Sequence, residues 1–128
     1  MPTRFTSHVA LPDDTKVALV ETLNVALATT IDLQSQLKQA HWNIKGPQFF
    51  ARHELFDNVA VKLRDFADLI AERATTLGGY AHGTIRLSAE ASKLPEYELR
   101  AVDGKHHIKA LVDRFSVYTA FVRQAITE

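Results

Sequence analysis

The chain has no cysteine and no excess charge, and each absence excludes a class of function. Without a thiol in its 128 residues, it can form no disulfide, thiolate metal site or cysteine nucleophile. Its 15 basic and 15 acidic residues cancel, so no overall field favours nucleic acid or an anionic membrane. The first fourteen residues hold only Arg4 and His8 against Asp13 and Asp14, which argues against DNA binding through a basic tail.

Long apolar runs are also missing. No run approaches the roughly twenty residues that span a bilayer, and no basic segment followed by an apolar one opens the chain. We therefore expect a cytoplasmic protein without a membrane partner. A chain of 128 residues can enclose a single hydrophobic core, so we expect one domain over residues 1–128.

Glycine and proline are few, at 5 and 4 residues, and they separate long stretches of helical periodicity. Apolar residues recurring every three to four positions predict a helix over Asp13–Asn43 and another over Phe49–Leu77. Residues 78–102 mix glycine, serine and proline, which predicts a long crossover with a short helix near Ser88–Lys93. A last helix is expected from Asp103, a plausible N-cap, to the chain end. The core-facing residues predicted for the three long helices are Val20, Leu23, Leu27, Ile31, Leu37, Phe56, Ala60, Leu63, Ala67, Ile70, Ala74, Leu77, Ile108, Leu111, Phe115, Tyr118, Val122 and Ala125.

This order of elements predicts an all-α fold. Two antiparallel helices, a long crossover carrying a short helix, and a further helix match the ferritin-like helical bundle with one crossover. Such a bundle has four long helices, whereas the pattern shows only three. We therefore expect the C-terminal fourth helix to be absent from this chain, which would leave the apolar stripes of the other three uncovered.

The second helix carries a strip of metal-ligand residues beside its apolar face. At about 100° per residue, His53, Asp57, Asp68 and Glu72 fall within about 100° of one another. Asp57 and Asp68 are eleven residues apart, which is about 16 Å along the axis, whereas metal–oxygen bonds are about 2 Å long. One ion cannot contact both carboxylates, so the strip contains two half-sites, His53 with Asp57 and Asp68 with Glu72.

A second copy of the chain would complete both half-sites. Antiparallel pairing of this helix with its copy, crossing near Lys62 and Leu63, brings the first half-site of one chain to the second half-site of the other, as a two-fold interface requires. His41 joins the first half-site because the short NIKGPQ connection turns the chain back beside His53. Imidazole and carboxylate ligands without thiolate suit Fe, Zn or Mn, and iron is the best single choice.

A plainer interpretation competes with the metal site. A single His or Asp on an amphipathic helix is usually solvated or satisfied by a neighbour. Glu54 and Asp65 also lie at the edge of the strip, so acidic residues on this face are not confined to the proposed ligands. We interpret His82, His106 and His107 as residues outside the site, the last two at the surface of a helix start, where adjacent side chains diverge by about 100°.

The stretches AHWNIKGPQFFARHELFD and DLIAERATTLGG resemble the Dps family of miniferritins, and the likeness runs from about residue 15 to the end. The spacing of His41, His53, Asp57, Asp68 and Glu72 follows that family's ferroxidase motif at every position. The resemblance implies a hollow dodecamer whose two-fold interfaces each hold two irons, with Asp68 and Glu72 contributed by the partner subunit. Zn(II) would be a substitute for iron at these ligands.

The resemblance also implies an activity. Members of that family oxidise Fe(II), preferably with hydrogen peroxide, and store the ferric product, which protects against oxidative damage. Trp42 looks like the family's tryptophan beside the centre, where it would intercept oxidising equivalents. From the residues alone, a tryptophan such as Trp42 is more often a core or interface anchor than a redox participant.

Two other functions stay open on the sequence. One is a non-catalytic helical oligomer that compacts DNA or sequesters metal, although the balanced charge and the N-terminal segment do not support DNA binding. The other is a helical fragment that associates with itself through its uncovered apolar stripes.

Overall fold

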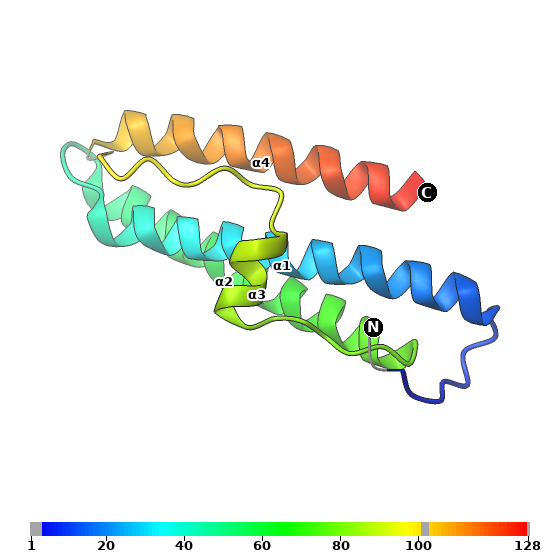
Figure 1. Ribbon diagram of the computed structural model, residues 1–128. Coiled ribbons are helices and arrows are strands. Elements are labelled where there is room, and N and C mark those ends of the chain that lie inside the picture. The colour runs from blue at the N-terminus through cyan, green and yellow to red at the C-terminus, as the bar shows by residue number, and fades with distance from the viewer. Residues whose placement is uncertain (1–3, 101–102, 128) are drawn as a thin grey trace.

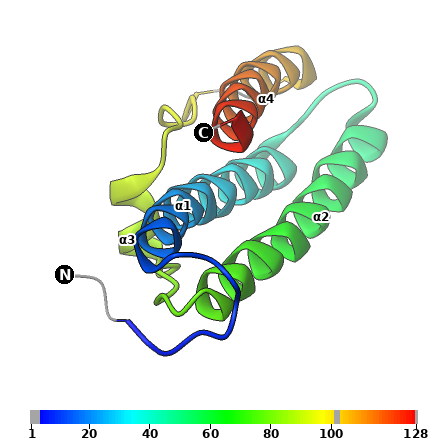
Figure 2. The ribbon, with the colours of Figure 1, turned by 90° about the vertical axis from the view of Figure 1, so that its right-hand side faces the viewer.

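The computed structural model describes residues 4–100 and 103–127, and it is helical with no strand in those ranges. Its elements are α1 (Asp13–Asn43), α2 (Phe49–Thr76), α3 (Ile85–Ala91) and α4 (Gly104–Thr127). Helix α1 contacts each of the other three. It lies between α2 and α4, with α3 and the extended crossover on the side away from α2 (Figure 1; Figure 2). The predicted all-α fold with three long helices and a short one is confirmed.

The core forms where α1, α2 and the start of α4 meet. Its members are Leu33, Leu37, Ala40, Ile44, Phe56, Ala60, Leu63, Tyr97, Ala110 and Leu111. The predicted stripe of α2 is buried at Phe56, Ala60, Leu63, Ala67 and Ala74. Among the described helices, α1 alone has the length and hydropathy to cross a membrane; here it is the central helix of the bundle.

The short crossover helix begins earlier than predicted. It spans Ile85–Ala91 instead of Ser88–Lys93, because the hydroxyl of Thr84 caps it by accepting the backbone N–H of Leu87 at 3.3 Å. The helix ends before Ser92, whose hydroxyl donates to the carboxylate of Asp32 on α1 at 2.7 Å. A cap at one end and a tertiary hydrogen bond at the other thus set the limits of α3.

Helix α4 begins as predicted but presents a different face. The carboxylate of Asp103 accepts the N–H of His106 at 2.9 Å, which confirms Asp103 as the cap. His107, predicted to lie at the surface, is 1% exposed, whereas Ile108, predicted to face the core, is 37% exposed. The reason is tertiary: Tyr97 of the crossover supplies a hydrogen-bond partner for the buried imidazole.

An apolar groove of about 770 Å³ runs between α1, α2 and α4. Leu63, Phe66 and Ile70 of α2 line one side, and Tyr118 and Val122 of α4 line the other. All four buried residues of α4 lie in its first eight positions, from Gly104 to Leu111. The rest of α4, residues 112–127, has no fully buried residue, and its inward-facing apolar side chains line this open groove.

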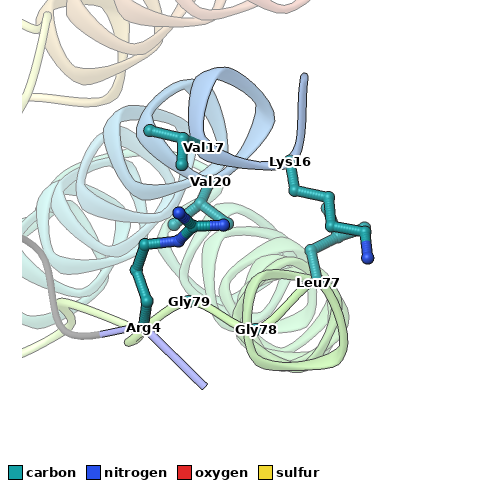
Figure 3. Close-up of a pocket in the computed structure, with 7 residues that line it drawn as sticks. All are labelled: Arg4, Lys16, Val17, Val20, Leu77, Gly78 and Gly79. Carbon is teal, nitrogen blue, oxygen red and sulfur yellow. The ribbon is translucent and has the colours of Figure 1, made fainter. Parts of the chain in front are cut away.

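The C-terminal end of α2 is closed by two glycines. Gly78 adopts φ +87°, and the N–H groups of Gly78 and Gly79 bond to the carbonyls of Thr75 and Ala74, each at 3.0 Å. This is the paired hydrogen bonding of a glycine-terminated helix. Gly79 then passes directly against Val20 of α1 (Figure 3). The close approach leaves no room for a side chain at Gly79.

Replacing Gly79 with alanine tests this contact. The added Cβ would overlap both methyl groups of Val20, which is 5% exposed and cannot move aside. We expect Gly79→Ala to lower the free energy of unfolding by about 1–3 kcal/mol, measured by urea denaturation.

The control is a double-mutant cycle with Val20→Ala. Removing the two methyl groups makes room for the new Cβ, so the double variant should be more stable than the sum of the two single changes predicts. Additive losses would show that the overlap with Val20 is not the cause.

Candidate metal centre

The turn between α1 and α2 brings two histidines face to face. The chain reverses through Gly46 at φ +97° and Gln48 at φ +61°, which places the last turn of α1 against the first turns of α2. The rings of His41 and His53 stack there with centroids 3.7 Å apart and an interplanar angle of 18°. The ring of Phe49 also stacks with that of His53, with centroids 5.1 Å apart.

Reciprocal hydrogen bonds set the orientation of both rings. The Nδ1 atom of His41 lies 2.6 Å from the carbonyl oxygen of His53, and Nδ1 of His53 lies 2.7 Å from the carbonyl oxygen of His41. A carbonyl oxygen only accepts, so each Nδ1 carries the hydrogen. In the neutral rings the lone pair is then on Nε2, which is the form in which a histidine held by a backbone carbonyl binds a metal.

Asp57 lies one turn after His53 but is held by a cation. The ammonium of Lys38 is 2.7 Å from the carboxylate, and this hydrogen bond lowers the pKa of Asp57 below its usual value. Lys38 also lies over the ring of Trp42 at 5.6 Å. Lys38 is the residue of this region that the sequence reasoning missed, although its position three residues before His41 on the same helix could have indicated it.

The other two predicted ligands lie on the distant half of α2. Asp68 and Glu72 are both exposed, eleven or more residues after Asp57, which is about 16 Å along a helix. Within residues 4–100 and 103–127, no three His, Asp or Glu side chains converge to hold a metal ion. The structure thus brings His41 and His53 together, pairs Asp57 with Lys38, and leaves Asp68 and Glu72 apart from them. Trp42, beside the histidines, is 67% exposed.

Comparison with known proteins identifies the family. The model of the ferritin-like domain matches residues 20–128. A DNA protection during starvation protein of Agrobacterium fabrum is 40% identical over 118 residues, which are 92% of this chain and 73% of that protein. The chain belongs to the Dps family of ferritin-like proteins. The resemblance seen in the sequence is confirmed.

Other Dps proteins share the sequence and the fold. The Mycolicibacterium smegmatis relative is 33% identical over 79% of this chain and 55% of its own. The structure of DpsA14 from Streptomyces coelicolor superposes with a TM-score of 0.92 at 31% identity, covering 98% of this chain and 75% of that one. The Dps structure of Vibrio cholerae O1, described as a ferritin-like diiron-carboxylate protein, superposes with a TM-score of 0.88 at 27% identity over 95% of this chain and 76% of that one.

Replacing Lys38 with methionine tests whether its ammonium lowers the pKa of Asp57. The folded-state pKa of Asp57 lies below its ordinary value of 3.8, so the ion pair contributes stability above that value and loses it as pH falls through the lowered pKa. We expect Lys38→Met to raise the pKa of Asp57 and to flatten the acid limb of stability against pH. Carbon-detected NMR titration of the carboxyl group measures the first, and urea denaturation between pH 2 and about pH 5 measures the second.

Lys109→Met is the matched control, since Lys109 is an exposed lysine of α4 that makes no ion pair among the described residues. An unchanged titration of Asp57 in Lys38→Met would contradict the assignment.

Proposed function

We propose that the protein is a cytoplasmic ferroxidase that oxidises Fe(II), preferably with hydrogen peroxide, and stores the ferric product. The observation that carries this proposal is the pair of reciprocal hydrogen bonds between His41 and His53, which directs the hydrogen of both rings to Nδ1. Two imidazoles with Nε2 lone pairs, one turn from the carboxylate of Asp57, are ligands of the type that ferrous iron accepts.

The site is completed by a second subunit. His41, His53 and Asp57 form the first half, and Asp68 and Glu72 of the partner form the second. Val61, 40% exposed, and Lys62 lie midway between the two half-sites of α2, where an antiparallel copy would cross. The two-fold dimer would then contain two equal centres, each for two irons. The Dps relationship favours assembly of such dimers into a dodecamer, and Zn(II) would compete for the same ligands.

The ligand set favours oxidation. Carboxylates are hard donors that stabilise Fe(III) more than Fe(II), which lowers the reduction potential of bound iron and favours electron transfer to peroxide. Two ferrous ions supply the two electrons that peroxide needs to become water, so no hydroxyl radical is released. Trp42 beside the half-site would intercept the oxidising equivalents that escape this reaction.

Lys38 has a part in this chemistry. Its ammonium must leave Asp57 before the carboxylate can bind iron, because a lysine and a metal ion compete for the same oxygen. The ion pair keeps Asp57 ionised, and partial exposure of both side chains, 31% and 42%, leaves room for the exchange.

The described helices are proposed to belong to a single ferritin-like domain. Four long helices make such a bundle, and a fourth is not among residues 4–100 and 103–127. The groove between α2 and α4 has the apolar lining that a fourth helix would cover. DNA is not a proposed partner, because the formal net charge is zero.

Subunit mixing tests the shared site. Asp57→Ala and Asp68→Ala should each abolish peroxide-dependent ferric absorbance. In a mixed dimer of the two variants, one centre has both lesions and the other has neither. Random reassociation of equal amounts makes half of the dimers mixed, so mixing after reversible dissociation should restore activity at about a quarter of all centres.

The control is the double variant Asp57→Ala/Asp68→Ala mixed with unaltered chain. The same substitutions are present in the same amounts, yet both centres of each mixed dimer carry one lesion, and mixing should lower activity. No rescue in the mixture of the two single variants, with mixed dimers shown by native mass spectrometry, would overturn the shared site. Ferric absorbance that survives in both single variants would overturn the ferroxidase proposal itself.

A further inference from the structure

A buried phenol and imidazole lie behind the histidine half-site. The hydroxyl of Tyr97 is 2.6 Å from Nδ1 of His107, and the two rings stack with centroids 5.9 Å apart and an interplanar angle of 12°. Tyr97 is 6% exposed and His107 is 1% exposed. The pair joins the crossover to the first turn of α4.

An aromatic contact links this pair to α2. The rings of Phe56 and His107 pack edge to face, with centroids 6.5 Å apart and an interplanar angle of 60°. Phe56 directly precedes Asp57 and follows His53 by three residues, so one turn of α2 carries the half-site on one face and Phe56 on the core face. Tyr97, His107 and Phe56 thus form a continuous set of rings that ends beside the half-site.

We propose that Tyr97 supplies the second electron when peroxide reacts at a half-site holding a single ferrous ion, with His107 accepting the phenolic proton. The inference rests on the proposed ferroxidase function and adds a redox residue to it. Tyr97 would then allow peroxide to be fully reduced before a second iron has arrived.

The surroundings of Tyr97 suit a coupled loss of electron and proton. Burial raises the pKa of Tyr97 to about 12, so the phenol keeps its proton until it is oxidised. The guanidinium of Arg114 lies 5.7 Å over the ring and opposes a positively charged radical. Transfer of the proton to Nδ1 of His107 gives a neutral phenoxyl radical, which this cation does not oppose.

The reaction is balanced in electrons and atoms. Fe(II), hydrogen peroxide, Tyr97 with its phenolic hydrogen and neutral His107 give Fe(III), two hydroxide ions, the Tyr97 phenoxyl radical and protonated His107. The ferrous ion and the phenol each lose one electron, and the oxygen–oxygen bond of peroxide gains both. A second ferrous ion then reduces the radical, and His107 returns its proton to the phenolate.

Trp42 is the competing donor, and its surroundings are less favourable. The Trp42 indole first forms a cation radical when it is oxidised, and it needs a nearby base to become a neutral radical. It is also 67% exposed, and no described base accepts a hydrogen bond from its indole N–H. Without a base for its proton and in contact with solvent, an oxidised Trp42 is short-lived, so the lasting radical is expected on Tyr97.

Electron paramagnetic resonance after rapid freezing tests the proposal. The assembled protein is loaded anaerobically with Fe(II), below and at full occupancy, and mixed with hydrogen peroxide while ferric absorbance is followed. We expect a neutral tyrosyl signal that is strongest below full occupancy and narrows when tyrosine is ring-deuterated. Tyr97→Phe should lose the signal and keep the ferric absorbance, whereas Tyr80→Phe, at an exposed tyrosine, should keep both.

His107→Gln separates the redox role from a structural one. An amide oxygen still accepts the phenolic hydrogen bond but is not a base, so the fold, followed by circular dichroism and Tm, should survive while the tyrosyl signal is lost. A signal that persists in Tyr97→Phe, or one that narrows only with deuterated tryptophan, would overturn the proposal. Ferric absorbance without any tyrosyl signal would overturn the role of Tyr97 and leave the ferroxidase function standing. The absence of ferric absorbance would overturn both.

Discussion

Two hydrogen bonds across the α1–α2 turn are the interaction on which the packing of the two helices and the proposed metal centre depend. Each histidine donates to the backbone carbonyl of the other, so the end of α1 and the start of α2 hold each other at a fixed separation. The same bonds place a lone pair on both Nε2 atoms. The bonds that align the two helices therefore also orient the two imidazoles as the proposed metal centre requires.

Charge compensation governs the state of the half-site in a single chain. Asp57 is next to two ligand-type imidazoles, yet its nearest cation is Lys38 at 2.7 Å. A carboxylate paired in this way stays ionised, which is the form that the proposed exchange of the ammonium for iron requires. Asp68 and Glu72 lie about 16 and 22 Å beyond Asp57 along α2, which is why the proposed centre needs a second subunit.

The core next to the first turns of α2 contains a polar pair, formed by Tyr97 and His107. Tyr97 and His107 satisfy each other in a region where a lone polar group would be costly, and Phe56 connects them to the ligand-bearing turn. The polar bonds of Gln36 to the carbonyl of Pro95 at 2.9 Å and to Arg114 at 3.1 Å hold the crossover and α4 in the position that this pairing needs. The groove between α1, α2 and α4 is instead lined mainly by apolar side chains, as expected of a surface that packs against another helix.

Local patterns in the sequence determined the elements, whereas tertiary contacts decided what their side chains do. Apolar periodicity and the glycines predicted α1 and α2 within one residue of their ends, and Asp103 predicted the start of α4, because these signals act within a few residues. The burial of His107, the ion pair of Lys38 with Asp57 and the early start of α3 at Ile85 were not predicted. Periodicity gives the angle of a side chain about its own helix and carries no information on the neighbour it meets. That neighbour, Tyr97 for His107 and Lys38 for Asp57, comes from another part of the chain and is known only once the helices have packed.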